Sequence, residues 1–276
     1  MTVICSCYEH DSAYQWSDFT VKSLEELEKV LKHKKMSYPV VVFWMGINNI
    51  TGEIFPILKI GEICHNFNAF YICDATSFFS HEYIPDELEK YCDGFIINGH
   101  KIGAEVGYGL IWMSDNLRTL LTKSGTHTGT PNLKEAITLQ NITEYYSDKK
   151  IASEKIHDFY LFDTLVENLK SNQIDFRVVA EEKNRTKAIN AIQLLGVNAS
   201  TLQNYLCSQH IYVGLGQSSC ADEEDNRILC EGYGLSPKDA SEVIRISFNH
   251  NNYDGEIIIL VKEIKKFKEM YCNEGN

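Results

Sequence analysis

AFYICDATSFFSHEYIPDELEKYCDGFIINGHKIGAEVGYG, residues 69–109, is the stretch of sequence that decides the fold of this chain. It contains two short apolar runs, Phe70 to Cys73 and Gly94 to Ile97, and polar residues follow each run at once. Asp74 follows the first run, and Asn98-Gly99-His100-Lys101 follows the second. Because the carboxyl ends of buried parallel strands open onto a common edge, the pattern predicts a ligand site with an acid and an amine there.

Lys101 and Asp74 are the residues of this stretch that could carry chemistry. A lysine beside His100 in a partly apolar pocket can lose its proton and attack a carbonyl carbon, so Lys101 is a Schiff-base candidate. A carboxylate beside a pyridine nitrogen keeps that ring protonated, as the electron-sink chemistry of pyridoxal phosphate requires, and Asp74 could supply it. Spacing alone leaves the ordinary alternative open, in which Asp74 merely ends a strand and Lys101 is solvated.

Three short segments resemble the cofactor core of the class V aminotransferase family, which depends on pyridoxal phosphate. They are Asp74-Ala75-Thr76, Asn98-Gly99-His100-Lys101 and Gly107-Tyr108-Gly109, in that order along the chain. Within the family the chain is most similar to the cysteine desulfurases. The resemblance therefore implies pyridoxal 5′-phosphate as cofactor and cysteine as substrate.

The resemblance also assigns the contacts to the cofactor. Lys101 is implied to carry it, Asp74 to pair with its ring nitrogen, and His100 to touch its phosphate. Ser77 stands where the family commonly has a Gln near the phenolic oxygen. Asn98 stands where the family usually has a Ser or Thr that binds phosphate, and its amide could donate instead.

Three further motifs resemble segments of the same family. The Glu-His-x-x-Ala motif implies that His10 stacks on the cofactor ring and transfers protons, for which an imidazole is suited. The Asn-Asn-Ile-Thr-Gly motif implies that Asn49 reaches the cofactor and the substrate carboxylate, with Ile50 in place of the usual Glu. The loop from His127 to Asn132 implies that Thr130 reaches the phosphate of a neighbouring subunit, and hence a homodimer. Read as bare sequence, these motifs are a capping histidine, an ordinary turn and a polar loop.

Cys220 and Arg245 complete the set of candidate residues. Cys220 ends the Gly- and Ser-rich loop 214–220, and the acidic run Asp222 to Asp225 that follows should raise its pKa, as expected of an ordinary loop cysteine. The loop nevertheless resembles the one that presents the persulfide-forming cysteine of the desulfurases. Arg245 lies in an apolar strand pattern, where it is either a salt-bridged structural residue or, as the resemblance implies, a bidentate clamp on the substrate's α-carboxylate.

Composition limits the other possibilities. The chain has 276 residues, 44% of them apolar, and a net charge of −12, which disfavours a nucleic-acid partner. No apolar run approaches the ~20 residues that span a bilayer, so no membrane partner is expected. The nine cysteines include no pair of zinc-type motifs, so we expect no metal site and a reducing, cytoplasmic location.

The order of patterns predicts the fold. Strands alternate with helices through the first half, which indicates an α/β protein with a mainly parallel sheet sandwiched by helices. The resemblance implies fold type I of the pyridoxal-phosphate enzymes, with a cofactor domain at 1–150 and a smaller C-terminal α+β domain at 151–276. Apolar patterns predict several elements: helices at Val21–His33, Ile57–Asn66, Pro85–Tyr91 and Ile257–Phe267, and strands at Val40–Met45 and Ile211–Val213. The state of Ala188–Leu195 stays open.

Desulfurases begin with a longer segment that includes a phosphate-binding Gly-Ala-Thr loop at a helix start, and this sequence starts after it. We therefore expect either that another chain supplies that part or that the protein is a truncated or degenerate member. The leading hypothesis is a desulfurase that moves sulfur from L-cysteine to Cys220 as a persulfide, releases alanine and passes the sulfur to an acceptor protein. The alternatives are a non-catalytic binding or scaffold protein and a selenocysteine lyase or aminotransferase.

Overall fold

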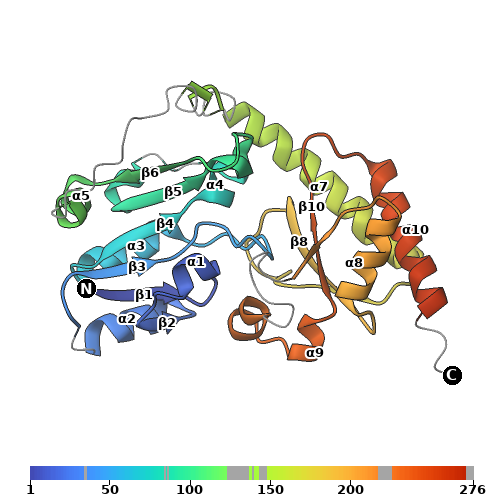
Figure 1. Ribbon diagram of the computed structural model, residues 1–276, viewed down its shortest axis with the longest axis horizontal. Coiled ribbons are helices and arrows are strands. Elements are labelled where there is room, and N and C mark those ends of the chain that lie inside the picture. Colours follow the sequence, from blue (N-terminus) through green and yellow to red (C-terminus); the bar gives the residue numbers. More distant parts are fainter. Residues whose placement is uncertain are drawn as a thin grey trace. The chain divides into compact units, whose positions relative to one another are not determined.

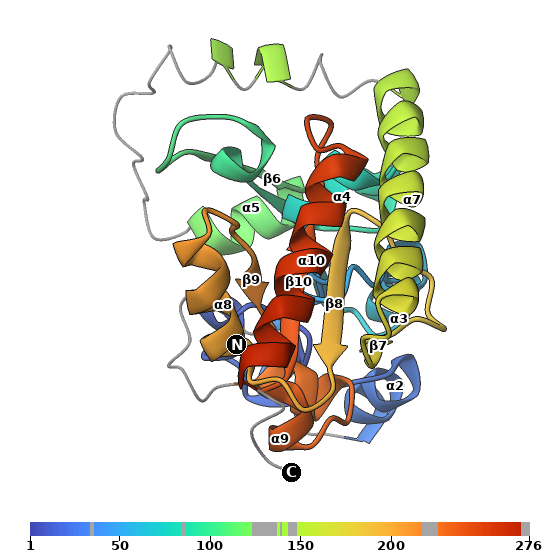
Figure 2. The ribbon, with the colours of Figure 1, turned by 90° about the vertical axis from the view of Figure 1, so that its right-hand side faces the viewer.

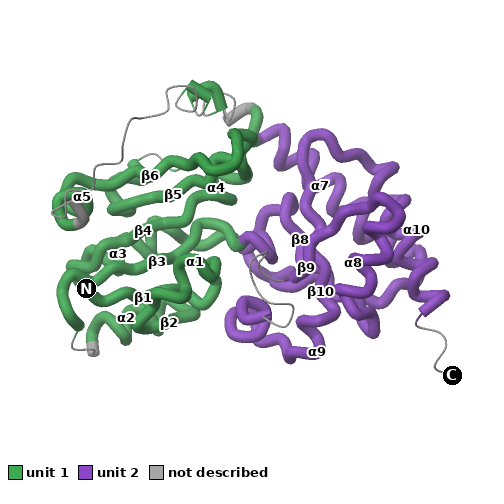
Figure 3. The backbone as a smooth tube through the Cα atoms, viewed as in Figure 1, with its two compact units in different colours: residues 1–48, 54–151 green, residues 49–53, 152–276 purple. Residues whose placement is uncertain are grey.

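The computed structural model describes residues 1–33, 36–83, 85, 87–122, 137–138, 140–142, 148–216 and 226–271. The chain divides into two compact units, coloured separately in Figure 3. Unit 1 comprises residues 1–48 and 54–151, and unit 2 comprises residues 49–53 and 152–276. The short segment 49–53 thus belongs to unit 2 although unit 1 flanks it on both sides in the sequence.

Unit 1 is built on a six-stranded sheet with strand order β2-β1-β3-β4-β5-β6 (Figure 1). Its strands are β1 (Thr2–Ser6), β2 (Phe19–Val21), β3 (Val40–Phe43), β4 (Phe70–Asp74), β5 (Gly94–Asn98) and β6 (Gly109–Met113). Neighbouring strands from β2 to β5 pair in parallel, and β6 returns antiparallel to β5. The predicted mainly parallel sheet is confirmed, and its carboxyl edge carries the residues after β1, β3, β4 and β5.

Short helices and turns follow these strands along the chain. They are α1 (Asp11–Tyr14), α2 (Leu24–His33), α3 (Ile57–Asn66), α4 (Thr76–His81), α5 (Asp115–Thr122) and the 3-10 turns η1 (Leu88–Lys90) and η2 (Gly99–Ile102). The prediction for α3 is confirmed to the residue, because its apolar face is continuous. Gly61 on that face leaves room for the backbone of Tyr91, whose carbonyl oxygen would clash with an added Cβ.

Two predictions for unit 1 are wrong in part. The helix expected from Val21 begins at Leu24, because Phe19–Val21 pairs with β1 as strand β2. The β-branched pair Thr20-Val21 favours that strand. The helix expected over Pro85–Tyr91 is reduced to the single turn η1, since Glu87 adopts a left-handed conformation with φ of 68°.

Unit 2 contains a four-stranded antiparallel sheet with strand order β7-β8-β10-β9. Its elements are α7 (Asp148–Ser171), β7 (Phe176–Val178), β8 (Ile189–Leu194), α8 (Ala199–Ser208), β9 (Gly214–Leu215), the π-helical turn η3 (Ile228–Gly232), α9 (Pro237–Ala240), β10 (Val243–Ser247) and α10 (Asp254–Tyr271). The first residues of α7, up to Ile151, are counted with unit 1. The predicted smaller α+β part is confirmed, and the open segment 188–195 is strand β8.

The strand predicted at Ile211–Val213 is wrong, and pairing starts only at Gly214. The carbonyl oxygen of Val213 accepts a hydrogen bond of 2.8 Å from the side chain of Gln203 on α8 instead of a strand partner. Ile211 and Val213 are partly buried against the large apolar cluster of unit 2. Their apolar character therefore reflects packing under α8 rather than a sheet.

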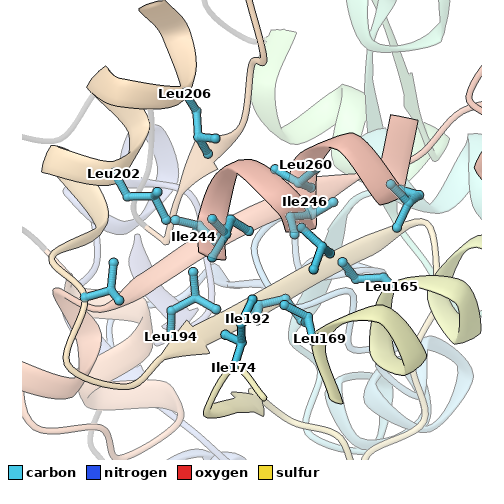
Figure 4. Close-up of a cluster of buried hydrophobic side chains, with 14 of the residues drawn as sticks. Leu165, Leu169, Ile174, Ile192, Leu194, Leu202, Leu206, Ile244, Ile246 and Leu260 are labelled. Carbon is cyan, nitrogen blue, oxygen red and sulfur yellow. The ribbon is translucent and has the colours of Figure 1, made fainter. Parts of the chain in front are cut away.

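The sheet of unit 2 buries apolar side chains on both faces, since alternate residues of a strand point to opposite sides. On one face, residues such as Ile192, Leu194, Ile244 and Ile246 join the helices α7, α8 and α10 in a large cluster (Figure 4). Figure 2 shows these three helices beside β8 and β10. On the other face, Ala191 belongs to a smaller cluster: Ile50, Val179, Ala191, Ile228, Leu229, Ala240 and Val243.

Candidate functional site

The ends of β4 and β5 are tied together at the carboxyl edge of unit 1. Asp74 lies opposite Ile96 in the parallel register, and the amide of Ala75 donates to the carbonyl oxygen of Ile96 at 2.8 Å. The backbone amide of Thr76 donates to Oδ1 of Asp74 at 2.9 Å, and the hydroxyl of Thr76 accepts from the amide of Asn98 at 3.1 Å. Asp74 and Asn98, predicted from sequence to share an edge, are therefore neighbours through Thr76.

The turn η2 carries His100 and Lys101 directly after β5. Its buried residues are Gly99 and Ile102, while His100 and Lys101 are exposed. An added Cβ at Gly99 would lie 2.7 Å from the carbonyl oxygen of Tyr108, which explains the glycine at this position. The partly apolar pocket expected around Lys101 is therefore not enclosed by the residues that the structure describes. Within the described ranges, the amine of Lys101 forms no ion pair or hydrogen bond.

His10 and Ser77 also lie beside the carboxyl edge of the sheet. His10 follows β1 and caps α1, where its Nδ1 accepts from the amide of Ser12 at 3.2 Å. The capping interpretation of His10 is thus correct. Ser77 is half-buried in the first turn of α4, three residues after Asp74. The sheet therefore brings His10, Asp74, Ser77, Asn98 and the η2 turn to one edge.

Asn49 and Arg245 lie together in unit 2. Nη1 of Arg245 donates to the backbone oxygen of Asn49 at 3.0 Å. Arg245 stands on β10 opposite Gly214 of β9, and its guanidinium lies where a side chain on Gly214 would be, 2.9 Å from an added Cβ. Burial lowers the pKa of Arg245. No described acid forms an ion pair with Arg245, and the acidic run Asp222 to Asp225 lies outside the described residues. The amide oxygen of Asn49 is buried without a hydrogen-bond partner among the described residues.

Two residues near Asn49 were not found from the sequence. Nε of Arg185 donates to the backbone oxygen of Thr51 at 3.2 Å, and the hydroxyls of Thr51 and Tyr233 lie 2.7 Å apart. Burial lowers the pKa of Arg185 to about 10. Arg185 directly follows the polar run Glu181-Glu182-Lys183-Asn184, which is typical of a solvated loop, so the sequence carried no signal of its burial.

Thr130, His127 and Cys220 lie outside the described residues. Among the described residues, no group of three His, Cys, Asp or Glu side chains is arranged to hold a metal ion. No described helix is both long and apolar enough to cross a membrane.

The residues of the unit 1 edge fit pyridoxal 5′-phosphate. Oδ1 of Asp74 is engaged by Thr76, while Oδ2 has no hydrogen-bond partner in the described part of the chain and could accept from a protonated ring nitrogen. The amine of Lys101 is exposed one strand away. The side chains of Ser77 and Asn98 lie between them in chain order and offer a hydroxyl and an amide to cofactor oxygens.

An acid and a lysine follow adjacent parallel strands of an α/β unit, and the same chain contains a smaller unit with an antiparallel sheet. The sequence profile described as aminotransferase class-V matches residues 14–260. The chain belongs to the class-V aminotransferase family. The family expected from the motifs is therefore confirmed.

The chain is also similar in sequence to individual curated proteins. The probable cysteine desulfurase of Borreliella burgdorferi is 22% identical over 91% of this chain and 62% of its own length. The cysteine desulfurase IscS of Rickettsia typhi is 23% identical over 83% of this chain and 57% of its own length. The chain thus spans about three fifths of the length of these curated relatives.

Solved structures support the same fold. The X-ray structure of a NifS-like protein from Rickettsia africae superposes with a TM-score of 0.83 at 21% identity, covering 98% of this chain and 76% of that one. The apo structure of a cysteine desulfurase from Thermococcus onnurineus superposes with a TM-score of 0.73 at 16% identity, covering 98% and 73%. At such identities the likeness establishes the fold and not the activity.

Proposed function

We propose that the protein is a pyridoxal-phosphate-dependent cysteine desulfurase, which takes sulfur from L-cysteine. The observation that carries the proposal is the placement of Asp74 and Lys101 after neighbouring parallel strands, with an acid oxygen that accepts no hydrogen bond from a described residue and an exposed amine on the lysine. The names of the relatives support the same substrate. A cysteine substrate, a homodimer and a sulfur-acceptor protein belong to this proposal.

The residues of unit 1 would hold the cofactor. Lys101 would bind it through its amine, and Asp74 would hold its ring nitrogen protonated. Ser77, Asn98 and His100 would donate to its oxygens, and Thr130 of a second subunit would add a phosphate contact. When bound, pyridoxal 5′-phosphate supplies an electron sink that weakens the bonds at the substrate's Cα. His10 would move a proton, because an imidazole can both donate and accept one near neutral pH.

The residues of unit 2 would hold the substrate. Arg245 carries a planar guanidinium suited to the α-carboxylate, and Nη1 already donates to the backbone of Asn49. The amide oxygen of Asn49, which has no hydrogen-bond partner in the described part of the chain, could accept from the substrate or the cofactor. A partly buried guanidinium that has no acidic partner among the described residues is costly, and binding a carboxylate would relieve that cost.

The sulfur step would fall to Cys220. Its thiolate would attack the sulfur of the substrate cysteine, so that an S–S bond forms as the substrate's C–S bond breaks. The electron pair of the broken bond stays with the substrate carbon, which then takes up a proton. Cysteine and a thiol are thereby converted to alanine and a persulfide, with no other oxidant or reductant.

The test is an assay of alanine and persulfide made from L-cysteine by the purified protein with added cofactor. Alanine should form in the wild type and in Cys207→Ser, which removes an exposed cysteine of α8. It should be lost in Cys220→Ser. Alanine release that persists in Cys220→Ser would rule out the sulfur step. Protein that takes up no cofactor, judged by its visible absorption, would favour a binding or scaffold role, and a preference for selenocysteine would favour a lyase of that substrate.

A further inference from the structure

The segment Asn49–Glu53 is held from several sides within unit 2. Ile50 is fully buried in the smaller apolar cluster of the unit 2 sheet. The carbonyl oxygen of Gly52 accepts from the amide of Thr186 at 2.9 Å. The backbones of Glu53 and Arg185 pair in an isolated antiparallel β-bridge. Gly52 has φ of 78°, and an added Cβ would lie 2.5 Å from the carbonyl oxygen of Ile189, so only glycine fits there.

Arg185 is the centre of this arrangement. Its Nε donates to the oxygen of Thr51 at 3.2 Å, and its Nη2 donates to the oxygen of Ile189 at 2.9 Å and to Oδ1 of Asn190 at 2.6 Å. Only 7% of the residue is exposed. The guanidinium stacks over Phe162, with 5.1 Å from its central carbon to the ring centroid. Three acceptors and a ring fix the side chain in one orientation.

The hydrogen bonds of Arg185 connect to Arg245 by two routes, one through Asn190 and one through the segment 49–53. Asn190 accepts from Arg185 and donates to the carbonyl oxygen of Ile246 at 3.4 Å, one residue beyond Arg245 on β10. Arg185 also donates to the backbone oxygen of Thr51, which lies two residues after Asn49. The backbone oxygen of Asn49 in turn accepts from Arg245 at 3.0 Å. The guanidinium of Arg245 and the turn that carries Asn49 are thus fixed relative to each other.

Tyr233 fastens the same segment from the η3 turn. Its hydroxyl lies 2.7 Å from the hydroxyl of Thr51, which is fully buried. The amide of Glu53 donates to that same Thr51 oxygen at 3.3 Å. Arg185 therefore hydrogen-bonds to the backbone of Thr51, and Tyr233 hydrogen-bonds to its side chain. Thr51 lies two positions after Asn49. We call these two residues the clasp.

From this geometry we propose that Arg185 and Tyr233 are positioning residues, which hold the segment 49–53 so that Asn49 keeps Arg245 oriented for a substrate carboxylate. This inference rests on the proposed function, which gives Arg245 a substrate carboxylate to bind. Neither residue contacts the substrate in this scheme. Loosening the clasp should weaken substrate binding through Arg245 and leave the chemical step of bound substrate nearly intact.

The test compares Arg185→Lys and Tyr233→Phe with the matched control Lys187→Met. Lys187 also lies over Phe162, 4.4 Å from ring centroid to amine, and forms no hydrogen bond to segment 49–53. Hydrogen exchange of the Glu53 and Thr186 amides should become roughly 10-fold faster in both clasp variants and stay unchanged in the control. KM for L-cysteine should rise roughly 10-fold in Arg185→Lys, with kcat changed by less than about 3-fold.

Unchanged exchange of both amides in Arg185→Lys and Tyr233→Phe would overturn the clasp. So would an equal rise of exchange in Lys187→Met, because the effect would then be general loosening. A fall in kcat with KM unchanged would also count against positioning of the carboxylate. The exchange readout needs no turnover, so an inactive wild type would refute the desulfurase and leave the clasp to be decided by exchange alone.

Discussion

The carboxyl edge of unit 1 and the segment 49–53 of unit 2 hold their candidate residues in opposite ways. Lys101 stands exposed on a one-turn helix and has no polar contact among the described residues. Arg245 is partly buried beside a backbone oxygen, and the residues that surround it are fixed by hydrogen bonds and apolar packing. A nucleophile has to move and react, whereas a carboxylate clamp has to stay in place. The two regions should therefore respond differently to substitution.

The largest expected effect is on Lys101. Lys101→Ala should lower alanine formation on the order of 10³-fold or more, because the amine that would hold the cofactor is gone. Its free energy of unfolding should change by less than about 0.5 kcal/mol, since the side chain is exposed. The rate of alanine formation checks the first expectation, and thermal unfolding checks the second. Lys59→Ala, which removes an exposed amine on α3, is the control. A large loss of stability in Lys101→Ala would remove the contrast between the two regions.

The next effect concerns Ile50, where the family usually has a Glu. Ile50 is fully buried among apolar side chains, so Ile50→Glu should destabilise the protein by about 3–5 kcal/mol. Burial would raise the folded-state pKa of the new carboxyl above its unfolded value. The loss should therefore be smallest in acid, where both states are protonated, and grow as pH rises through the folded pKa. Chemical denaturation at several pH values measures this.

Ile50→Val is the control for that experiment, because it keeps the site apolar and should cost only about 1 kcal/mol at every pH. If Ile50→Glu were as stable as the wild type at neutral pH, segment 49–53 would not be anchored by the apolar cluster. The family residue would then be compatible with this chain, and the replacement by isoleucine would need another explanation.

A smaller effect on stability is expected from Asp158 on α7. This residue tests the cost of burying a charge in unit 2 at a place away from the clasp. Burial, and then the nearby Glu154, raise the pKa of Asp158 to about 7. The folded protein thus keeps a proton that the unfolded chain loses near its ordinary value, so stability falls as pH rises from about 4 to about 7. Asp158→Asn should be about 2 kcal/mol more stable than the wild type at pH 8 and nearly equal to it at pH 4.

Asp163→Asn, on the exposed side of the same helix, is the control for removing an acid of α7. Other ionisable groups near this part of α7 are His250, which lies 3.8 Å from Glu154, and His157, whose Nε2 contacts the oxygen of Asn252. A stability difference that stays constant from pH 4 to pH 8 would contradict a raised pKa at Asp158.

The two regions also differ in how far the sequence could predict them. Strand-end residues such as Asp74 and Asn98 follow directly from apolar runs, because a parallel sheet fixes where its strands end. The motif around Asn49 pointed to the right turn but not to its membership of unit 2. Arg185 and Tyr233 could not be predicted, since their contacts join segments more than a hundred residues apart in the sequence, and neither lies in a periodic pattern.

Secondary structure shows the same limit. The helix at Ile57–Asn66 was predicted to the residue because its apolar spacing extends over the whole element. The strand predicted at Ile211–Val213 was wrong because three apolar residues fit a strand and a packed loop equally well. Local patterns thus determine long elements, whereas short ones depend on contacts such as the hydrogen bond from Gln203 to Val213.

The smallest effect is expected from two glycines of unit 2, Gly214 and Gly216, which separate the orientation of Arg245 from the packing around it. Gly214→Ala should raise KM for L-cysteine by about tenfold, because the new Cβ would lie 2.9 Å from Nε of Arg245 and push the guanidinium from its position beside Asn49. Stability should fall by less than about 1 kcal/mol, since the group that yields is the end of a flexible side chain. Gly216→Ala is the matched control at the same loop: its Cβ would meet Leu229 at 2.7 Å, so it should cost stability and leave KM unchanged. If instead both variants raised KM alike, the orientation of Arg245 would depend on general packing of this loop and not on the space above Gly214.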